Sequence, residues 1–107
     1  MYTNNSYSDG NWHHVVCTRE IVDILAGTAT AYIYVDGTLE TSGSILADNI
    51  DEVLSMGPNI WTVGNNGRTT TPQAFEGEIS TLRIYSVALT ADQVTQNFNA
   101  NRGLFGL

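Results

Sequence analysis

The sequence has no lysine, a single cysteine and two prolines. Its basic residues are Arg19, Arg68, Arg83 and Arg102, against eleven acidic residues, which gives a formal net charge of −7. Nucleic-acid binding needs a basic stripe that neutralises phosphates, and an anionic membrane surface attracts clustered basic residues. The four scattered arginines therefore argue against both partners. An acidic surface without lysine suits a cation or a neutral polar ligand.

The lone cysteine, Cys17, has no partner in the chain for a disulfide. It lies in an apolar stretch, so a buried free thiol is the expected state, because free cysteine behaves as a small hydrophobic residue. No apolar run is long enough for a membrane span. The polar start of the chain does not have the pattern of a signal peptide.

At 107 residues the chain is long enough for one domain with a modest core, which we expect to extend over residues 1–107. Glycine, serine, threonine and asparagine are common and apolar runs are short, which favours strands and turns. Residues 12–19 have apolar side chains at both odd and even positions, so both faces of a strand here would be apolar. This pattern predicts a strand covered on both sides, with Trp12, His14 and Val16 on one face. A short strand over residues 21–25 is expected to follow and to close in a turn at residues 26–28.

The clearest strand pattern covers residues 30–35, where Ala31, Ile33 and Val35 alternate with more polar residues. Asp36-Gly37 follows it and predicts a tight hairpin turn, because both central positions of that turn favour a positive φ. Residues 38–42 are then expected to return as the partner strand.

Further strands are predicted over residues 60–64 and 75–85, the second being the longest. Within it, Ile79 is at an odd position and Leu82 and Ile84 are at even positions, so a regular strand would place Ile79 on the opposite face. A β-bulge near Ser80 or Thr81 would place all three apolar side chains inside.

One helix is predicted, and it begins at a capping box formed by Thr90-Ala91-Asp92-Gln93. Asp92 lies where the helix dipole favours a negative charge. An apolar face at helical spacing follows, made of Ala91, Val94 and Phe98. Gly103 is the expected end of the helix.

Three segments in sequence order resemble laminin-G-like and pentraxin-like domains. Trp12-His13-His14-Val15-Val16 is similar to their W-H-H-V-A strand, and Tyr32-Ile33-Tyr34-Val35-Asp36-Gly37 is similar to their L-Y-V-D-G hairpin. Phe75-x-Gly-x-Ile79, Leu82-Arg83-Ile84-Tyr85 and Ala88-Leu89-Thr90 are similar to their last strand and helix start. The resemblance implies an all-β fold: an antiparallel β-sandwich, the concanavalin A-like jelly roll, with one short C-terminal helix.

Domains of this family place several strands before the W-H-H-V strand, whereas eleven residues precede Trp12 here. The resemblance therefore implies an incomplete sandwich that lacks the usual N-terminal strands. Its open edges would be closed by a homo-oligomer or by a complementing partner chain.

The resemblance further implies a non-enzymatic, lectin-like binding module for carbohydrates or cell surfaces, within a larger secreted or virion protein. Residues 96–106 are similar to the C-termini of phage structural proteins. The alternative is thus a structural, assembly or decoration domain of a phage particle that acts by protein–protein contact. Both functions imply an extracellular or virion location.

The predicted ligand-binding residues are Trp61, Asn65, Asn66 and Arg68. Sugars are recognised by an aromatic face together with amide and guanidinium hydrogen bonds; the alternative is that Trp61 belongs to the core. Pentraxins bind calcium partly through an acidic loop at this position, but here the loop lacks carboxylates. No cofactor is therefore expected, and the sequence does not favour a calcium site.

No catalytic residue is predicted. Glu76 and Glu78 share a strand face, and glycosidases of this superfold use two carboxylates about 5 Å apart. Their E-x-D-x-x-E pattern is incomplete here, so a glycoside hydrolase is a distant third hypothesis, and solvated carboxylates are expected instead.

No metal-binding residue is predicted either. His13 and His14 are adjacent and face opposite sides of a strand, so they are expected to be structural rather than a metal clamp. Asp48, Asp51 and Glu52 lack the spacing of a calcium loop and are expected to form a solvated acidic loop.

Overall fold

The structure is a computed structural model of the whole chain, and it describes residues 2–46, 63–64 and 74–107. Two compact units are present. The first combines Met1–Ile50 with Tyr85–Leu107, and the second is Asp51–Ile84. That residues 1–107 form one domain stays a prediction.

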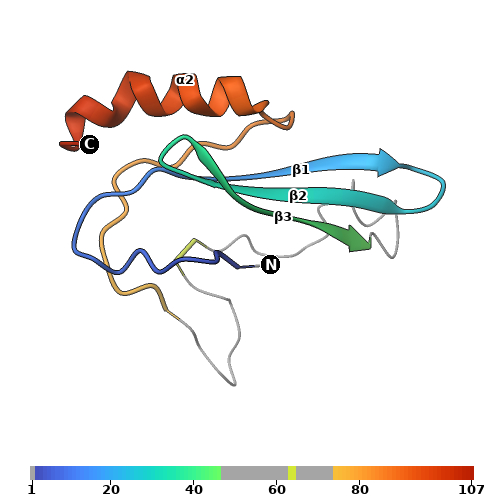
Figure 1. Cartoon of the computed structure of the whole chain (residues 1–107), viewed down its shortest axis with the longest axis horizontal. Coiled ribbons are helices and arrows are strands. Elements are labelled where there is room, and N and C mark those ends of the chain that lie inside the picture. Colours follow the sequence, from blue (N-terminus) through green and yellow to red (C-terminus); the bar gives the residue numbers. More distant parts are fainter. Residues whose placement is uncertain (1, 47–62, 65–73) are drawn as a thin grey trace. The chain divides into compact units, whose positions relative to one another are not determined.

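The first unit contains a three-stranded antiparallel sheet in the order β1-β2-β3 (Figure 1). Its strands are β1 (Val15–Asp23), β2 (Thr28–Val35) and β3 (Thr38–Leu46). Helix α2 (Ala91–Asn101) follows near the C-terminus. The predicted fold class is confirmed, because an antiparallel sheet with one short helix is consistent with part of a concanavalin A-like β-sandwich.

The hairpin between β2 and β3 turns at Asp36-Gly37, as predicted. Both residues have a positive φ, 51° at Asp36 and 80° at Gly37. The strands flank the turn directly, with Val35 opposite Thr38. A two-residue turn of this kind has a twist that matches the twist of the paired strands.

The other hairpin begins earlier than the sequence indicates. Strand β1 ends at Asp23, whose carboxylate accepts hydrogen bonds from the backbone N–H groups of Leu25 (2.8 Å) and Ala26 (3.0 Å). These bonds fold the chain into a turn, so the strand predicted over residues 21–25 is two residues too long. The predicted start at Trp12 is also wrong, because β1 begins at Val15.

The segment just before β1 lies against the C-terminal part of the chain. The ring of Trp12 lies 5.4 Å from the ring of Phe105, and that of His14 lies 6.0 Å from that of Phe98, centroid to centroid. Trp12 and His14 precede the strand, so the strand face predicted for them together with Val16 is not formed by these two residues.

The face of β1 that carries Val15, Cys17 and Ile21 differs from the prediction. Val15 and Ile21 are 57% and 42% exposed, and Cys17 is also exposed. The expected buried thiol and the expected cover on both faces are therefore wrong within the described ranges. Neighbouring groups still desolvate the Cys17 sulfur enough to raise its pKa, which keeps the thiol protonated.

Helix α2 begins at the predicted capping box. The Thr90 hydroxyl accepts from the Gln93 N–H (3.3 Å), and the Thr90 N–H donates to Gln93 Oε1 (2.9 Å). Val94 is fully buried and Phe98 is half-buried, as expected, whereas Ala91 is exposed. The α-helix ends at Asn101, and Gly103 lies in the 3-10 helix Arg102–Leu104 that continues from it.

The strand predicted over residues 75–85 is absent: these described residues have no strand conformation. Ile79, Leu82 and Ile84 are 52%, 58% and 69% exposed, so the predicted bulge that would bury them is wrong as well. Locally, the Phe75 N–H donates to the Gly64 carbonyl at 2.7 Å. A Cβ at Gly77 would lie 2.8 Å from the Phe75 ring, which explains the Phe-x-Gly pattern. Of the strand predicted over residues 60–64, only residues 63–64 are described.

Candidate functional site

The predicted ligand-binding residues Trp61, Asn65, Asn66 and Arg68 lie outside the described residues, as does the acidic group Asp48, Asp51 and Glu52. These assignments stay predictions. The described residues contain three other arrangements of polar side chains, all in the first unit. They are a histidine–carboxylate network at the β2–β3 turn, a carboxylate contact between the N-terminal segment and β3, and an open pocket on the sheet.

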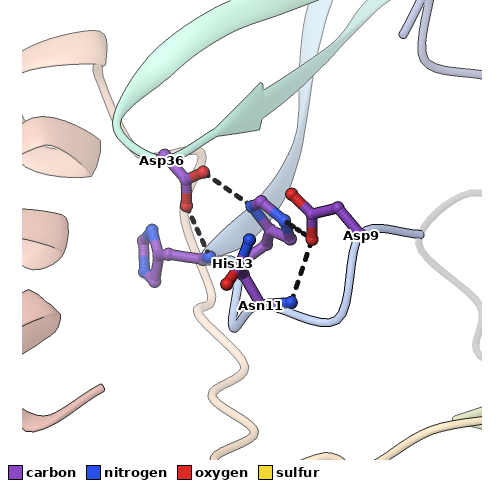
Figure 2. A network of polar contacts seen from close by, with 5 residues as sticks. Asp9, Asn11, His13 and Asp36 are labelled. Carbon is purple, nitrogen blue, oxygen red and sulfur yellow. Dashed lines mark hydrogen bonds and ion pairs between the residues drawn. The ribbon is translucent and has the colours of Figure 1, made fainter. Parts of the chain in front are cut away.

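The network is centred on the imidazole of His13 (Figure 2). His13 Nδ1 lies 2.8 Å from Asp36 Oδ2, and His13 Nε2 lies 3.0 Å from Asp9 Oδ1. Asp36 Oδ1 also accepts from the backbone N–H of His14 at 2.9 Å, and Asp9 Oδ1 accepts from that of Asn11 at 2.9 Å. The hairpin turn is therefore bonded to the chain just before β1.

In this network the hydrogen bonds stabilise the charged forms of His13 and Asp9. The hydrogen bond to Asp36, followed by that to Asp9, raises the pKa of His13 above its ordinary value. The N–H of Asn11 and the ring of His13 lower the pKa of Asp9 to about 2. Both shifts favour an imidazolium between two carboxylates. The arrangement is a structural clamp, which agrees with the structural role expected for His13.

A third carboxylate, that of Glu40, bonds the N-terminal segment to β3. Glu40 Oε1 accepts from the backbone N–H and the side-chain amide of Asn5, at 2.9 and 2.8 Å. The hydrogen bond from the Tyr7 hydroxyl is the main cause that lowers the pKa of Glu40. These bonds hold the N-terminal segment against β3.

The pocket lies on the face of the sheet that carries the even-numbered residues of β1 and β2. It has a volume of about 310 Å³ and is open to solvent. Thr18 and Glu20 of β1 line it, together with Tyr32 and Tyr34 of β2 and residues 88–91 before and at the start of α2. Thr18 pairs with Tyr32 across the two strands, which places their side chains next to each other.

Sequence reasoning did not find this pocket. Its only local signal is the alternation that places Tyr32 and Tyr34 on one face of β2. The wall formed by residues 88–91 comes from a distant part of the chain, which a strand pattern does not indicate.

The carboxylates considered for hydrolysis give no catalytic arrangement. Glu76 and Glu78 are exposed, as expected, but they do not lie on a strand. Over the described ranges, no three His, Cys, Asp or Glu side chains come together in a way that could hold a metal ion. Among the described residues, no helix has the length and apolar character required to cross a membrane.

Comparisons with known proteins agree with this fold. The family described as the concanavalin A-like lectin/glucanases superfamily, of the laminin G type, matches residues 1–95. A crystal structure of an S-layer domain-containing protein (residues 221–444) from Clostridium thermocellum has a TM-score of 0.57 and 21% identity. That match covers 90% of this chain and 43% of the other, so the chain spans less than half of that structure. No curated protein matches.

Proposed function

The chain belongs to the concanavalin A-like lectin/glucanase superfamily, and on that basis we propose that it is a non-enzymatic, extracellular module that binds carbohydrates or cell-surface glycans. The observation that carries the proposal is the family match over residues 1–95, together with an antiparallel sheet that agrees with it. Laminin G-like domains of this superfamily are generally non-enzymatic. The similarity to an S-layer domain-containing protein supports an extracellular location.

The chemistry of the chain fits a neutral polar ligand. Its net charge of −7 and lack of lysine disfavour anionic partners. We retain Trp61, Asn65, Asn66 and Arg68 as proposed ligand contacts, because an indole face with amide and guanidinium donors suits sugar hydroxyls.

A glycan array probed with the full chain tests the proposal. We expect binding to at least one saccharide class, and we expect Trp61→Ala to weaken it if the indole is a contact. An absence of binding across the array would refute the lectin function. Conserved affinity in Trp61→Ala and Arg68→Gln would refute only the contribution of this loop.

The second candidate is an assembly role through protein–protein contact, in a homo-oligomer, with a complementing chain or in a virion. It is favoured by the large exposed apolar side chains Val15, Ile21, Leu82 and Ile84, which a monomer in water leaves uncovered. Light scattering tests this role: we expect a species larger than the monomer. A stable monomer would contradict it.

Hydrolysis is the weakest candidate and rests on fold analogy alone. Glycan cleavage by the wild-type chain that disappears in Glu78→Gln would be needed to support it. We expect no cleavage by either protein.

A further inference from the structure

We propose that the pocket lined by Thr18, Glu20, Tyr32 and Tyr34 is a binding site for a saccharide that carries no acidic group. The proposal rests on the lectin function proposed above, and it adds both a site and a ligand class. None of the described residues that line the pocket belongs to the proposed contact set Trp61, Asn65, Asn66 and Arg68.

The size and lining of the pocket fit a small ligand. Ligand sites usually have volumes of about 300–1,000 Å³ and combine aromatic walls with a few polar groups. This pocket has about 310 Å³, which is sufficient for a single sugar unit with its neighbours extending into solvent. Its openness suits the end or side of a longer chain rather than an enclosed cofactor.

Two tyrosines form the aromatic part of the pocket. The rings of Tyr32 and Tyr34 are 6.4 Å apart and inclined by 30°. Tyr34 is 7% exposed, so its ring is fixed by packing, whereas Tyr32 is half-buried and keeps part of its ring accessible. A ring with an apolar face and a hydroxyl can contact both the C–H face and the hydroxyls of a sugar.

Polar groups lie beside these rings. Thr18 is a polar residue at only 9% exposure, and it lines the pocket. Glu20, two residues further along β1, is exposed and contributes a carboxylate. Within the described ranges, neither side chain has a hydrogen bond to the protein. Both are therefore available to sugar hydroxyls, and a carboxylate acceptor makes stronger hydrogen bonds than a neutral one.

Another part of the lining is ordered by hydrogen bonds. Thr90 is bonded in both directions to Gln93 by the capping box, which fixes the chain at Thr90, where it lines the pocket. A wall that is already ordered lowers the entropic cost of binding.

Charge selects the ligand class. Among the described residues that line the pocket, Glu20 is the charged one, and the whole chain carries a net charge of −7. A sulfate or carboxylate on the sugar would be repelled, whereas hydroxyls or an amine would be accepted. We therefore expect neutral or amino sugars and not acidic glycans.

The test uses the full chain on an array of neutral oligosaccharides, glucosamine oligomers and sulfated glycosaminoglycans, followed by calorimetric titration of the strongest binder. We expect Glu20→Gln to weaken binding about tenfold, because it removes a charge-assisted hydrogen bond. We expect Tyr32→Ala to weaken binding by at least about tenfold and Tyr32→Phe to weaken it less, since phenylalanine keeps the ring. Glu20→Gln needs no repacking because Glu20 is exposed, so it remains informative if Tyr32→Ala fails to fold.

Matched controls separate the site from general effects. Glu76→Gln removes one exposed carboxylate, and Tyr2→Ala removes a tyrosine that is 82% exposed, both outside the pocket lining. Both controls should keep the wild-type affinity. If Glu20→Gln and Tyr32→Ala bind saccharide as tightly as the wild type, the pocket is not the binding site, although the lectin function remains supported. A preference of the wild type for sulfated glycans would likewise contradict the proposed pocket and not the lectin function. The absence of any binding by the wild type would overturn both.

Discussion

Raising the pH is expected to destabilise the folded chain through His13. In the structure both imidazole nitrogens lie within 3.0 Å of a carboxylate oxygen, one from Asp36 and one from Asp9. A neutral imidazole has a single N–H, so it can donate to only one of them, whereas an imidazolium donates to both. The network therefore requires protonated His13.

The direction of the effect follows from the raised pKa of His13. A group with a folded-state pKa above its unfolded value of about 6.5 contributes its full stability below that pH and loses it as the pH rises through the folded pKa. The side chains of His13 and Asp36 are 16% and 31% exposed, so water screens part of the interaction. Charge-assisted bonds in such a partly exposed place contribute about 1 kcal/mol to the free energy of unfolding.

The lowered pKa of Asp9 acts at the other end of the pH range. Its folded-state pKa of about 2 lies below the unfolded value. Its contribution is therefore present above about pH 3.9 and is lost as the pH falls through about 2. Together the two groups predict the highest stability between these windows, in mildly acidic solution.

Urea unfolding of the wild type and Asp36→Asn between about pH 5 and 9 measures the effect. Asparagine tolerates the positive φ of 51° at this position, and its amide oxygen can still accept from the His14 N–H. We expect the wild type to lose about 1 kcal/mol across this range and Asp36→Asn to lose less than half of that. Equal pH dependence in both proteins, or an NMR titration that gives His13 a pKa no higher than about 6.5, would refute the reasoning.

Three further substitutions test the packing around α2. Gly37→Ala should lower the free energy of unfolding by about 2 kcal/mol in urea titrations, because the residue has φ 80° and a Cβ would lie 3.0 Å from Phe98. Gly10→Ala, with φ 83° and an open environment, should cost clearly less, and an equal cost would contradict the contact argument. Thr90→Ala should cost about 1 kcal/mol by thermal unfolding, and Thr90→Ser should restore most of it. Val94→Ala should cost about 2 kcal/mol because Val94 is fully buried; a cost near zero would show that the helix is not packed as described.

The parts of the fold that sequence reasoning predicted correctly depend on neighbouring residues. The Asp36-Gly37 turn requires a positive φ at two adjacent positions, and the cap of α2 requires a hydroxyl and an amide three residues apart. Both requirements can be recognised from a motif of two to four consecutive residues. Errors of a few residues occur where a side chain ends an element early, as Asp23 does for β1.

The parts that were predicted wrongly depend on partners from elsewhere in the chain. Alternating apolar residues over residues 75–85 indicate a surface that could be buried in a sheet, but a strand forms only when another strand accepts its hydrogen bonds. No such partner lies among the described residues, and the apolar side chains stay exposed. Cys17 shows the same limit, because its burial depends on whether its face of β1 is covered.

Two of the segments that carry the family resemblance, the one at His13-His14 and the β2–β3 turn, meet in the first unit, where the turn also contacts helix α2. The carboxylate of Asp36 binds the side chain of His13 and the backbone of His14, while the Gly37 carbonyl accepts from the Thr95 hydroxyl at 3.0 Å. Phe98 packs against Gly37, and Figure 1 shows the β2–β3 turn beside α2. The His-His segment and the turn therefore have a physical reason to occur together, and the turn is also the partner of the helix through Thr95 and Phe98. Residues that share partners in this way do not contribute independently, so Asp36→Asn and Gly37→Ala together should cost an amount that differs measurably from the sum of the two single changes.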